Sequence, residues 1–162
     1  MEKKFILTDK FVINSFGIKL FQIKCTKSFK YAQKGDFGGY VEKEGNLDQE
    51  NDAWVFGNAR VFGNARVSGD AWVSGNAWVS GDADIENDNE HCGFDGFGSC
   101  NRHTHAYMTK EKKVEIICGC FRGSIEEFEK KVEETHSGTV YEKQYKSIIN
   151  VIKIKFGLTD FT

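Results

Sequence analysis

The sequence predicts a mainly β protein: a short parallel β-helix of six-residue repeats, an N-terminal β segment before it, and a C-terminal α+β cap of two strands and two helices (ββαα) after it. Three observations predict the β-helix. A β-branched aliphatic residue recurs at every sixth position from Val55 to Ile85, and an alanine stands two positions before each of them. Five glycines, from Gly57 to Gly81, keep the same period, and Asn or Asp follows each one. A short fixed period of this kind is the signature of a solenoid.

Each six-residue unit is expected to be one short strand followed by a bend. The β-branched side chain points inward, and the alanine lies where the interior is narrow. Glycine followed by Asn or Asp adopts the unusual dihedral angles of the bend. One unit cannot bury its apolar edge alone, but stacked units bury a continuous ribbon of Val and Ala side chains.

With three units in each 18-residue coil, the repeat resembles the hexapeptide-repeat family of left-handed β-helices. This resemblance implies the left-handed winding, because the period alone does not set the hand. We expect the β-helix to span residues 37–87. Val41 and Leu47 are six positions apart and favour an imperfect first coil, whereas Lys43 and Gln49 stand where later repeats have valine. The phase of the repeat is therefore expected to slip before Ala53.

An 18-residue coil places residues 18 positions apart above one another. The expected neighbours are an aromatic pair, a cation–π pair and an ion pair: Trp54 with Trp72, Arg60 with Trp78, and Arg66 with Asp84. So many outward aromatic rings are too much apolar surface for a free monomer to leave in water. Either the terminal segments or a second subunit cover them, or they bind an outside partner, and both can hold at once. The residues expected at a partner or subunit contact are Trp54, Phe56, Arg60, Phe62, Arg66, Trp72 and Trp78.

The first 36 residues are expected to form the β segment. Apolar runs predict strands at Phe5–Leu7, Phe11–Ile13 and Ile18–Lys24, with a turn between the last two. Residues 88–102 are polar and contain several glycines, which predicts a loop.

Residues 103–162 are expected to form the cap. Apolar patterns predict strands at His103–Thr109 and Val114–Phe121. Ser124 with Glu127 has the spacing of a capping box, so a helix is expected to follow. A second helix is expected from about Tyr141, and its end is expected to switch to a strand over residues 152–156. The apolar residues on the two helix faces are Ile125, Phe128 and Val132, and Tyr145, Ile148, Ile149 and Ile152.

The charges of the chain are nearly balanced, with 22 Lys and Arg against 24 Asp and Glu and a formal net charge of −2. Such a chain has no global basic field to attract nucleic acid and no polybasic segment for a membrane surface. It has no apolar stretch of membrane-spanning length and no signal-peptide pattern. We therefore expect a cytoplasmic protein that does not bind nucleic acid directly. In that compartment most of its five cysteines are expected to be reduced.

No set of residues has the arrangement of a reaction centre, so we expect neither enzyme activity nor a cofactor. His103 with His105 and Cys118 with Cys120 are pairs two positions apart on expected strands, and all four side chains could converge on a zinc ion across one hairpin. Their spacing differs from that of paired Cys-x2-Cys zinc sites, so ordinary core thiols and histidines, with no bound metal, are the favoured interpretation. Cys120 and His136 could act as nucleophile and base, but Cys120 falls in an apolar strand, where a buried thiol is inert.

Three longer segments carry a second resemblance. GDFGGYVEKEGNLDQE leads into NDAWVFGNARVFGNA, and further along the chain comes GCFRGSIEEFEKKVEETH. In these segments the chain is similar to a family of small proteins common in bacteriophages and prophages, for which no general activity is known. The resemblance implies a phage or prophage origin and a bacterial host cytoplasm.

We therefore expect a non-enzymatic binding protein that occupies a host protein or nucleoprotein surface. With no reaction centre evident, the favoured role is inhibition of a bacterial defence system, in the manner of an anti-CRISPR, by a homo-oligomer (dimer or trimer). Three alternatives stay open. They are a hexapeptide-type acyltransferase, a structural or assembly protein, and a small-ligand sponge with an intersubunit pocket. Against the acyltransferase, none of the four histidines of this chain lies in the repeats.

Overall fold

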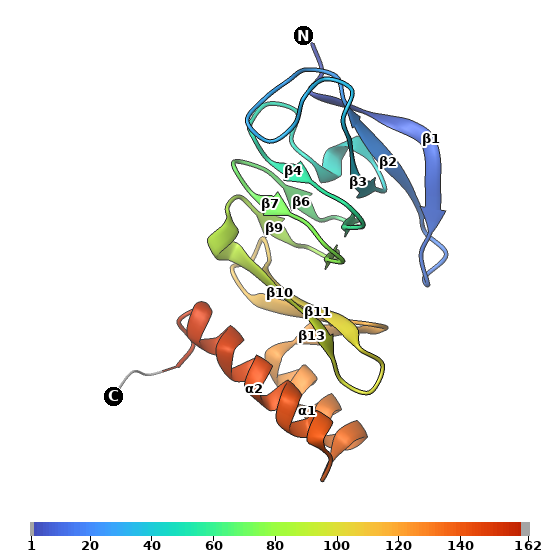
Figure 1. Ribbon diagram of the computed structural model, residues 1–162. Coiled ribbons are helices and arrows are strands. Elements are labelled where there is room, and N and C mark those ends of the chain that lie inside the picture. The colour runs from blue at the N-terminus through green and yellow to red at the C-terminus, as the bar shows by residue number, and fades with distance from the viewer. Residues whose placement is uncertain (1, 160–162) are drawn as a thin grey trace. The chain divides into compact units, whose positions relative to one another are not determined.

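A computed structural model describes residues 2–159 and divides the chain into two compact units, residues 1–88 and 89–162. The first unit holds strands β1 to β9, drawn blue to green in Figure 1. The second unit holds strands β10 to β13 and the helices α1 and α2, drawn yellow to red.

The repeats form short strands that pair in parallel. Each strand pairs with the strand 18 residues later, as Trp54 with Trp72 and Val55 with Val73, so β4 pairs with β7, β5 with β8 and β6 with β9. We call each six-residue unit, with its short strand and bend, a rung. Backbone hydrogen bonds join each rung to the one 18 residues later; for example, the N–H of Trp54 donates to the carbonyl oxygen of Ala71 at 3.1 Å. The predicted 18-residue stacking is confirmed. The strands are β4 (Trp54–Val55), β5 (Arg60–Val61), β6 (Arg66–Val67), β7 (Trp72–Val73), β8 (Trp78–Val79) and β9 (Asp84–Ile85).

The interior of the repeat region is filled by the aliphatic residues and alanines of the repeat. Every aliphatic residue from Val55 to Ile85 has no exposed surface, and no repeat alanine is more than 1% exposed. The repeat glycines have φ between +57° and +67°, the left-handed region in which a side chain is strained. They stand at the first central position of turns such as the one closed by the N–H of Ala59 and the carbonyl oxygen of Phe56, at 3.1 Å.

The N-terminal segment extends one sheet of the repeat region. Strand β1 (Phe5–Ile13) pairs antiparallel with β2 (Lys19–Cys25), which pairs antiparallel with β3 (Phe37–Val41), and β3 pairs in parallel with β5. The sheet order is β1-β2-β3-β5-β8. The two strands expected at Phe5–Leu7 and Phe11–Ile13 are therefore one strand, interrupted by an irregularity in register between Leu7 and Phe11.

The expected imperfect first coil is present, and so is the phase slip. Val41 pairs with Val61 and Leu47 with Val67, both 20 positions apart instead of 18. The short 3-10 helix η1 (Glu44–Asn46) lies between the two pairs. Asn46 is fully buried, and its amide donates to the carbonyl oxygens of Gly63 and Ala65, at 3.2 and 2.9 Å, in place of regular strand pairing.

Close backbone approach explains the pair of glycines in GDFGGYV. A Cβ on Gly38 would lie 2.6 Å from the carbonyl oxygen of Val55, and one on Gly39 would lie 2.6 Å from that of Ala59. Any side chain at either position would push β3 away from the first repeats. The two glycines therefore allow β3 to join the sheet.

The second unit has a four-stranded antiparallel sheet in the order β10-β11-β12-β13. Its strands are β10 (His91–Phe97), β11 (Arg102–Met108), β12 (Val114–Cys118) and β13 (Phe121–Ser124), and the 3-10 helix η2 (Asp88–Glu90) precedes them. The prediction of a loop at residues 88–102 is thus wrong for residues 91–97, which form β10. Gly93 and Gly96 made this strand look like a loop in the sequence. The cap has four strands before its helices, not the two of the expected ββαα order. The strand expected at Val114–Phe121 is divided because Gly119 turns the chain with φ +59°.

Both predicted helices are confirmed, as α1 (Ile125–His136) and α2 (Val140–Lys155). The capping box also forms: Ser124 Oγ accepts from the N–H of Glu127 at 3.1 Å, and the Glu127 carboxylate accepts from the N–H of Ser124 at 2.8 Å. The strand expected over residues 152–156 is wrong, because Ile152 is fully buried on the apolar face of α2 and the helix continues to Lys155. Over residues 2–159, no helix has the length and apolar character that crossing a membrane requires.

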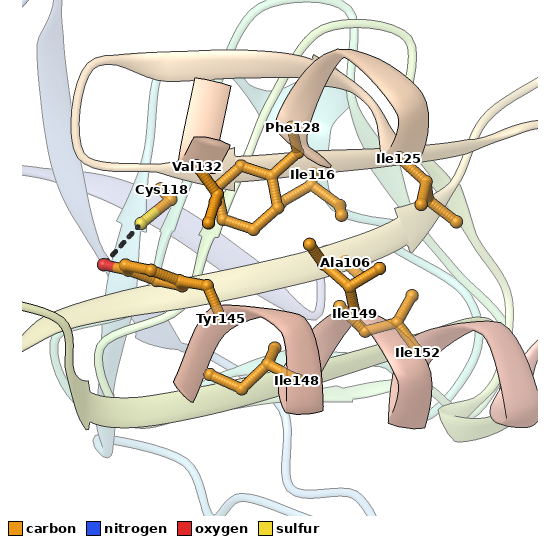
Figure 2. Close-up of a cluster of buried hydrophobic side chains, with 10 residues drawn as sticks. All are labelled: Ala106, Ile116, Cys118, Ile125, Phe128, Val132, Tyr145, Ile148, Ile149 and Ile152. Atoms are coloured by element: carbon orange, nitrogen blue, oxygen red, sulfur yellow. Dashed lines mark hydrogen bonds between the residues drawn. The ribbon is translucent and has the colours of Figure 1, made fainter. Parts of the chain in front are cut away.

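The predicted apolar faces of the two helices meet the sheet in one core. Figure 2 shows Phe128 and Val132 of α1 and Ile149 of α2 gathered around Ala106 and Ile116 of the sheet. The full cluster consists of Ala106, Ile116, Cys118, Ile125, Phe128, Val132, Tyr145, Ile148, Ile149 and Ile152.

Two repeat glycines with similar dihedral angles provide a test of the stacking. Gly57 and Gly69 have φ of +57° and +62°, but a Cβ on Gly57 would meet nothing closer than 3.9 Å, whereas one on Gly69 would lie 2.3 Å from the carbonyl oxygen of Glu86. We expect Gly57→Ala to cost roughly 1–2 kcal/mol of unfolding free energy for the left-handed backbone alone. Gly69→Ala should cost at least about 1 kcal/mol more, because it also separates two rungs. Urea unfolding followed by tryptophan fluorescence measures both; equal losses would contradict the stacking distance.

Candidate functional site

The repeat places its outward side chains in columns. Trp54 and Trp72 are partners in the ladder, as are Arg60 and Trp78, and Arg66 and Asp84. The predicted cation–π contact is present, with the Arg60 guanidinium 5.4 Å from the centre of the Trp78 ring. The predicted register of the columns is thus confirmed. Among the described residues, however, Trp54 and Trp72 make their ring contacts with other aromatic side chains, and Arg66 and Asp84 form no ion pair. The remaining question is which members of the columns are accessible.

Trp54 is not available to an outside partner, which corrects its expected position. It is 1% exposed because Phe5 and Phe29 pack edge-on against its ring, with centroids 6.3 and 5.3 Å away. Phe5 is held there by Gln49, whose Oε1 accepts from the Phe5 N–H at 3.2 Å and whose Nε2 donates to the Phe5 carbonyl oxygen at 3.0 Å. The N-terminal segment of the same chain covers this end of the column.

Phe62 is also covered by the chain itself. It is 3% exposed, and its ring lies 6.3 Å from Phe16 and 6.1 Å from Trp78. Trp78 and Arg60 are half-buried, and Arg66 is exposed. The structure thus separates the seven predicted contact residues into buried rings and accessible side chains.

Of the aromatic side chains at outward repeat positions, Trp72 is the most exposed. We call Trp72, with Phe56 and Tyr31 that pack against it, the aromatic patch. Phe56 stacks on Trp72 with centroids 4.0 Å apart and planes at 18°, and Tyr31 meets Trp72 edge-on at 4.9 Å. Trp72 is 42% exposed. The sequence did not identify Tyr31, because residues 26–36 have no periodicity that would place it beside the repeat.

A second cluster lies in the sheet of the second unit. Asp95, His103, His105 and His91 form a chain of hydrogen bonds: Asp95 Oδ1 to His103 Nδ1 at 2.7 Å, His103 Nε2 to His105 Nδ1 at 2.9 Å, and His105 Nε2 to His91 Nδ1 at 3.0 Å. One set of tautomers satisfies all three contacts, with each Nδ1–H donating toward the Asp95 carboxylate. We call this the histidine chain.

The geometry of the histidine chain follows from strand alternation and one glycine. Gly93 pairs with His105 across β10 and β11, and a Cβ on Gly93 would lie 2.6 Å from the His103 ring and 2.7 Å from the His105 ring. The glycine that hid β10 in the sequence is thus the one that lets the two imidazoles lie across it.

The four expected zinc candidates do not come together. His105 pairs with Ile117 and Thr104 pairs with Cys118, so the imidazole and the thiol belong to opposite faces of the sheet. Cys120 is exposed in the turn after β12, not buried in an apolar strand as expected. Among residues 2–159, no group of three or more His, Cys, Asp and Glu side chains is placed to hold a metal ion.

Burial shapes the electrostatics of the histidine chain. His105 is 3% exposed. Its pKa lies well below the usual value for histidine, first because burial disfavours the charged ring and then because His91 and His103 would repel it. His105 is therefore neutral at pH 7, so its ring can both donate and accept in the histidine chain.

The comparisons with known proteins concern the repeat. A family model described as the YdcK beta solenoid repeat matches three overlapping segments, residues 53–69, 59–75 and 65–81. Together these segments cover less than a fifth of the 162 residues. Among curated proteins, none matches the chain. The repeat region is thus similar to a β-solenoid repeat, in agreement with its parallel strand pairs.

The pKa of His105 makes the stability of the second unit depend on pH. An unfolded chain protonates this histidine near pH 6.5, whereas the folded chain does so only at lower pH. Its stabilising contribution is therefore complete above pH 6.5 and is lost as the pH falls, by up to about 1.4 kcal/mol per pH unit. Amide hydrogen exchange in β11 should accelerate below pH 6.5, after correction for intrinsic rates, and less so in His105→Gln. The same acceleration in both proteins would contradict this assignment.

Proposed function

We propose that this chain is a binding protein and that it holds a partner protein through the aromatic patch. The observation that carries the proposal is Trp72, which remains 42% exposed although Trp54, the other ring of its column, is covered by the chain itself. Tryptophan and tyrosine are the side chains most enriched at the centres of protein interfaces. An exposed tryptophan inside an aromatic cluster therefore has the chemistry of an interface anchor.

The patch is held rigidly, which favours binding. The N–H of Phe56 donates to the carbonyl oxygen of Val73 at 2.8 Å, and the N–H of Trp72 donates to the Asp88 carboxylate at 2.7 Å. The Tyr31 hydroxyl donates to the carbonyl oxygen of Asp70 at 3.4 Å. A surface that is already ordered loses little conformational entropy when a partner binds.

The finer identity of the protein belongs to the same proposal. The coil winds left-handed, as in hexapeptide-repeat proteins, and the chain comes from a phage or prophage. Its partner is a protein or nucleoprotein of the host, and occupying that surface inhibits a bacterial defence system. The left-handed winding is supported by the resemblance of the six-residue repeat to hexapeptide-repeat proteins. The phage origin and host partner are supported by the resemblance of the three long segments, together with a near-neutral net charge that gives no general attraction to nucleic acid.

Truncating the aromatic patch tests the proposal. In a pull-down from a bacterial host lysate with mass spectrometry, the wild-type chain should retain a specific protein. Trp72→Ala should weaken binding of the purified partner by about thirtyfold or more, the loss expected for an interface anchor. Circular dichroism should show the fold unchanged, because the valine and alanine interior is untouched.

Phe37→Ala is the matched control. Phe37 is 60% exposed on β3 in the same unit, but it is not part of the aromatic patch. It should bind the partner as the wild type does. Equal binding by Trp72→Ala and the wild type, or an equal loss in both variants, would count against this surface. Light scattering distinguishes a second copy of the chain as the partner.

A further inference from the structure

The second unit contains a pocket of about 480 Å³ that the proposed binding role does not use. Its size is in the range of sites for small organic molecules. The start of β11, the end of β12, the following turn, β13 and both helices contribute to it. Its lining residues are Arg102, Cys118, Cys120, Phe121, Arg122, Phe128, Lys131, Val132, Thr135, His136 and Tyr145.

The charge of this pocket is one-sided. Arg102, Arg122 and Lys131 bring three cations to it, His136 adds a titratable ring, and none of the described residues that line it is acidic. Arg122 does have a carboxylate neighbour, Glu115, but at 3.7 Å and with half of the arginine side chain exposed. In a chain with a net charge of −2, three cations around one cavity form a local field that attracts an anion.

Arg102 lies beside the turn between β12 and β13. Gly119, which turns the chain between β12 and β13, leaves room for it, because a Cβ on Gly119 would lie 2.6 Å from a terminal nitrogen of Arg102. The guanidinium therefore lies against the backbone of the turn. The planar donors of an arginine suit the paired oxygens of a phosphate.

Tyr145 supplies a buried donor. It is 5% exposed, and Figure 2 shows its hydroxyl pointing toward Cys118, whose sulfur lies 3.8 Å away. Sulfur is a weak hydrogen-bond partner, so the hydroxyl keeps capacity for a stronger acceptor. Burial, first, and the neighbouring Cys118 raise the pKa of Tyr145, so it stays protonated and able to donate. Phe128 and His136 hold its ring, each with centroids 5.5 Å away.

Part of the pocket wall is apolar. The ring centroids of Phe121 and Phe128 lie 5.1 Å apart, and Val132 is buried beside them. A bare inorganic anion would fill only a small part of the space. The pocket therefore suits an anion that carries an organic ring.

We propose that this pocket binds a nucleoside phosphate or a phosphate ester of similar size. Arg102, Arg122 and Lys131 hold the phosphate, Tyr145 donates to one of its acceptor atoms, and the ring of the ligand lies against the partly buried Phe121. The site lies within one chain and is independent of the aromatic patch.

Calorimetry on the full chain tests the site. The probes are the four ribonucleoside 5′-monophosphates, adenosine and inorganic phosphate, at low ionic strength. At least one monophosphate should bind saturably, and more tightly than adenosine or phosphate alone. Arg102→Met and Lys131→Met should each weaken that binding by about tenfold, the loss expected for one charge-assisted contact. Tyr145→Phe should weaken it severalfold while the helical core stays packed.

Lys130→Met is the matched control, because Lys130 neighbours Lys131 on α1, is exposed and does not line the pocket. It should bind as the wild type does. Absence of saturable binding by all four monophosphates at millimolar concentration would overturn the proposal, as would an equal loss in Lys130→Met and Lys131→Met. Thermal unfolding of each variant verifies its fold, and Lys131→Met, an exposed helix position, provides the test if Arg102→Met is unstable.

Discussion

The hydrogen-bonded stacking of one six-residue rung on another is the constraint on which the rest of the first unit depends. It requires aliphatic residues that fill the interior without gaps and glycines that turn the chain with positive φ, and both recur at every sixth position. Because the rungs are in register, whatever points outward from one rung lies over the side chain 18 positions later. The backbone thus turns a sequence period into columns of side chains, and a column such as that of Trp54 and Trp72 becomes a surface without any contribution from loops.

Glycines that make room for a neighbour recur in both units. Gly38 and Gly39 let β3 lie against the repeat, Gly93 lets two imidazoles lie across β10, and Gly119 lets Arg102 lie on the turn after β12. In each case a missing side chain allows a backbone or a functional group to approach closely. The candidate sites differ in chemistry, since one is an aromatic surface, one a chain of imidazoles and one a cationic pocket. All of them are nevertheless attached to strands or helices with buried apolar residues, and this keeps their geometry fixed.

The repeat region and the two helices could be predicted from the sequence, because a strict period leaves little freedom for the backbone. The period of Val and Ala gave the register, and Ser124 with Glu127 marked the start of α1. Contacts between distant segments could not be predicted. No pattern in the sequence indicates that Phe5 and Phe29 cover Trp54. Gly93 made β10 look like a loop in the sequence, although the imidazoles of the neighbouring strand β11 need a glycine at that position. The zinc site was considered on the assumption that the His103/His105 and Cys118/Cys120 pairs share one face of the sheet. In the observed register Cys118 pairs with Thr104, which puts it on the face opposite to His105.

The most direct test of this account is nuclear Overhauser contact between rungs. In a labelled sample, the amide proton of Trp54 should lie within reach of backbone protons of Ala71 and Trp72, and the amide proton of Arg60 within reach of those of Ala77 and Trp78, because the ladder joins these segments. Cross-peaks at this separation of 18 residues would support the stacking and the columns of side chains that follow from it. Cross-peaks that instead link neighbouring repeats as an antiparallel hairpin would contradict the stacking, and with it the surface that the partner is proposed to bind.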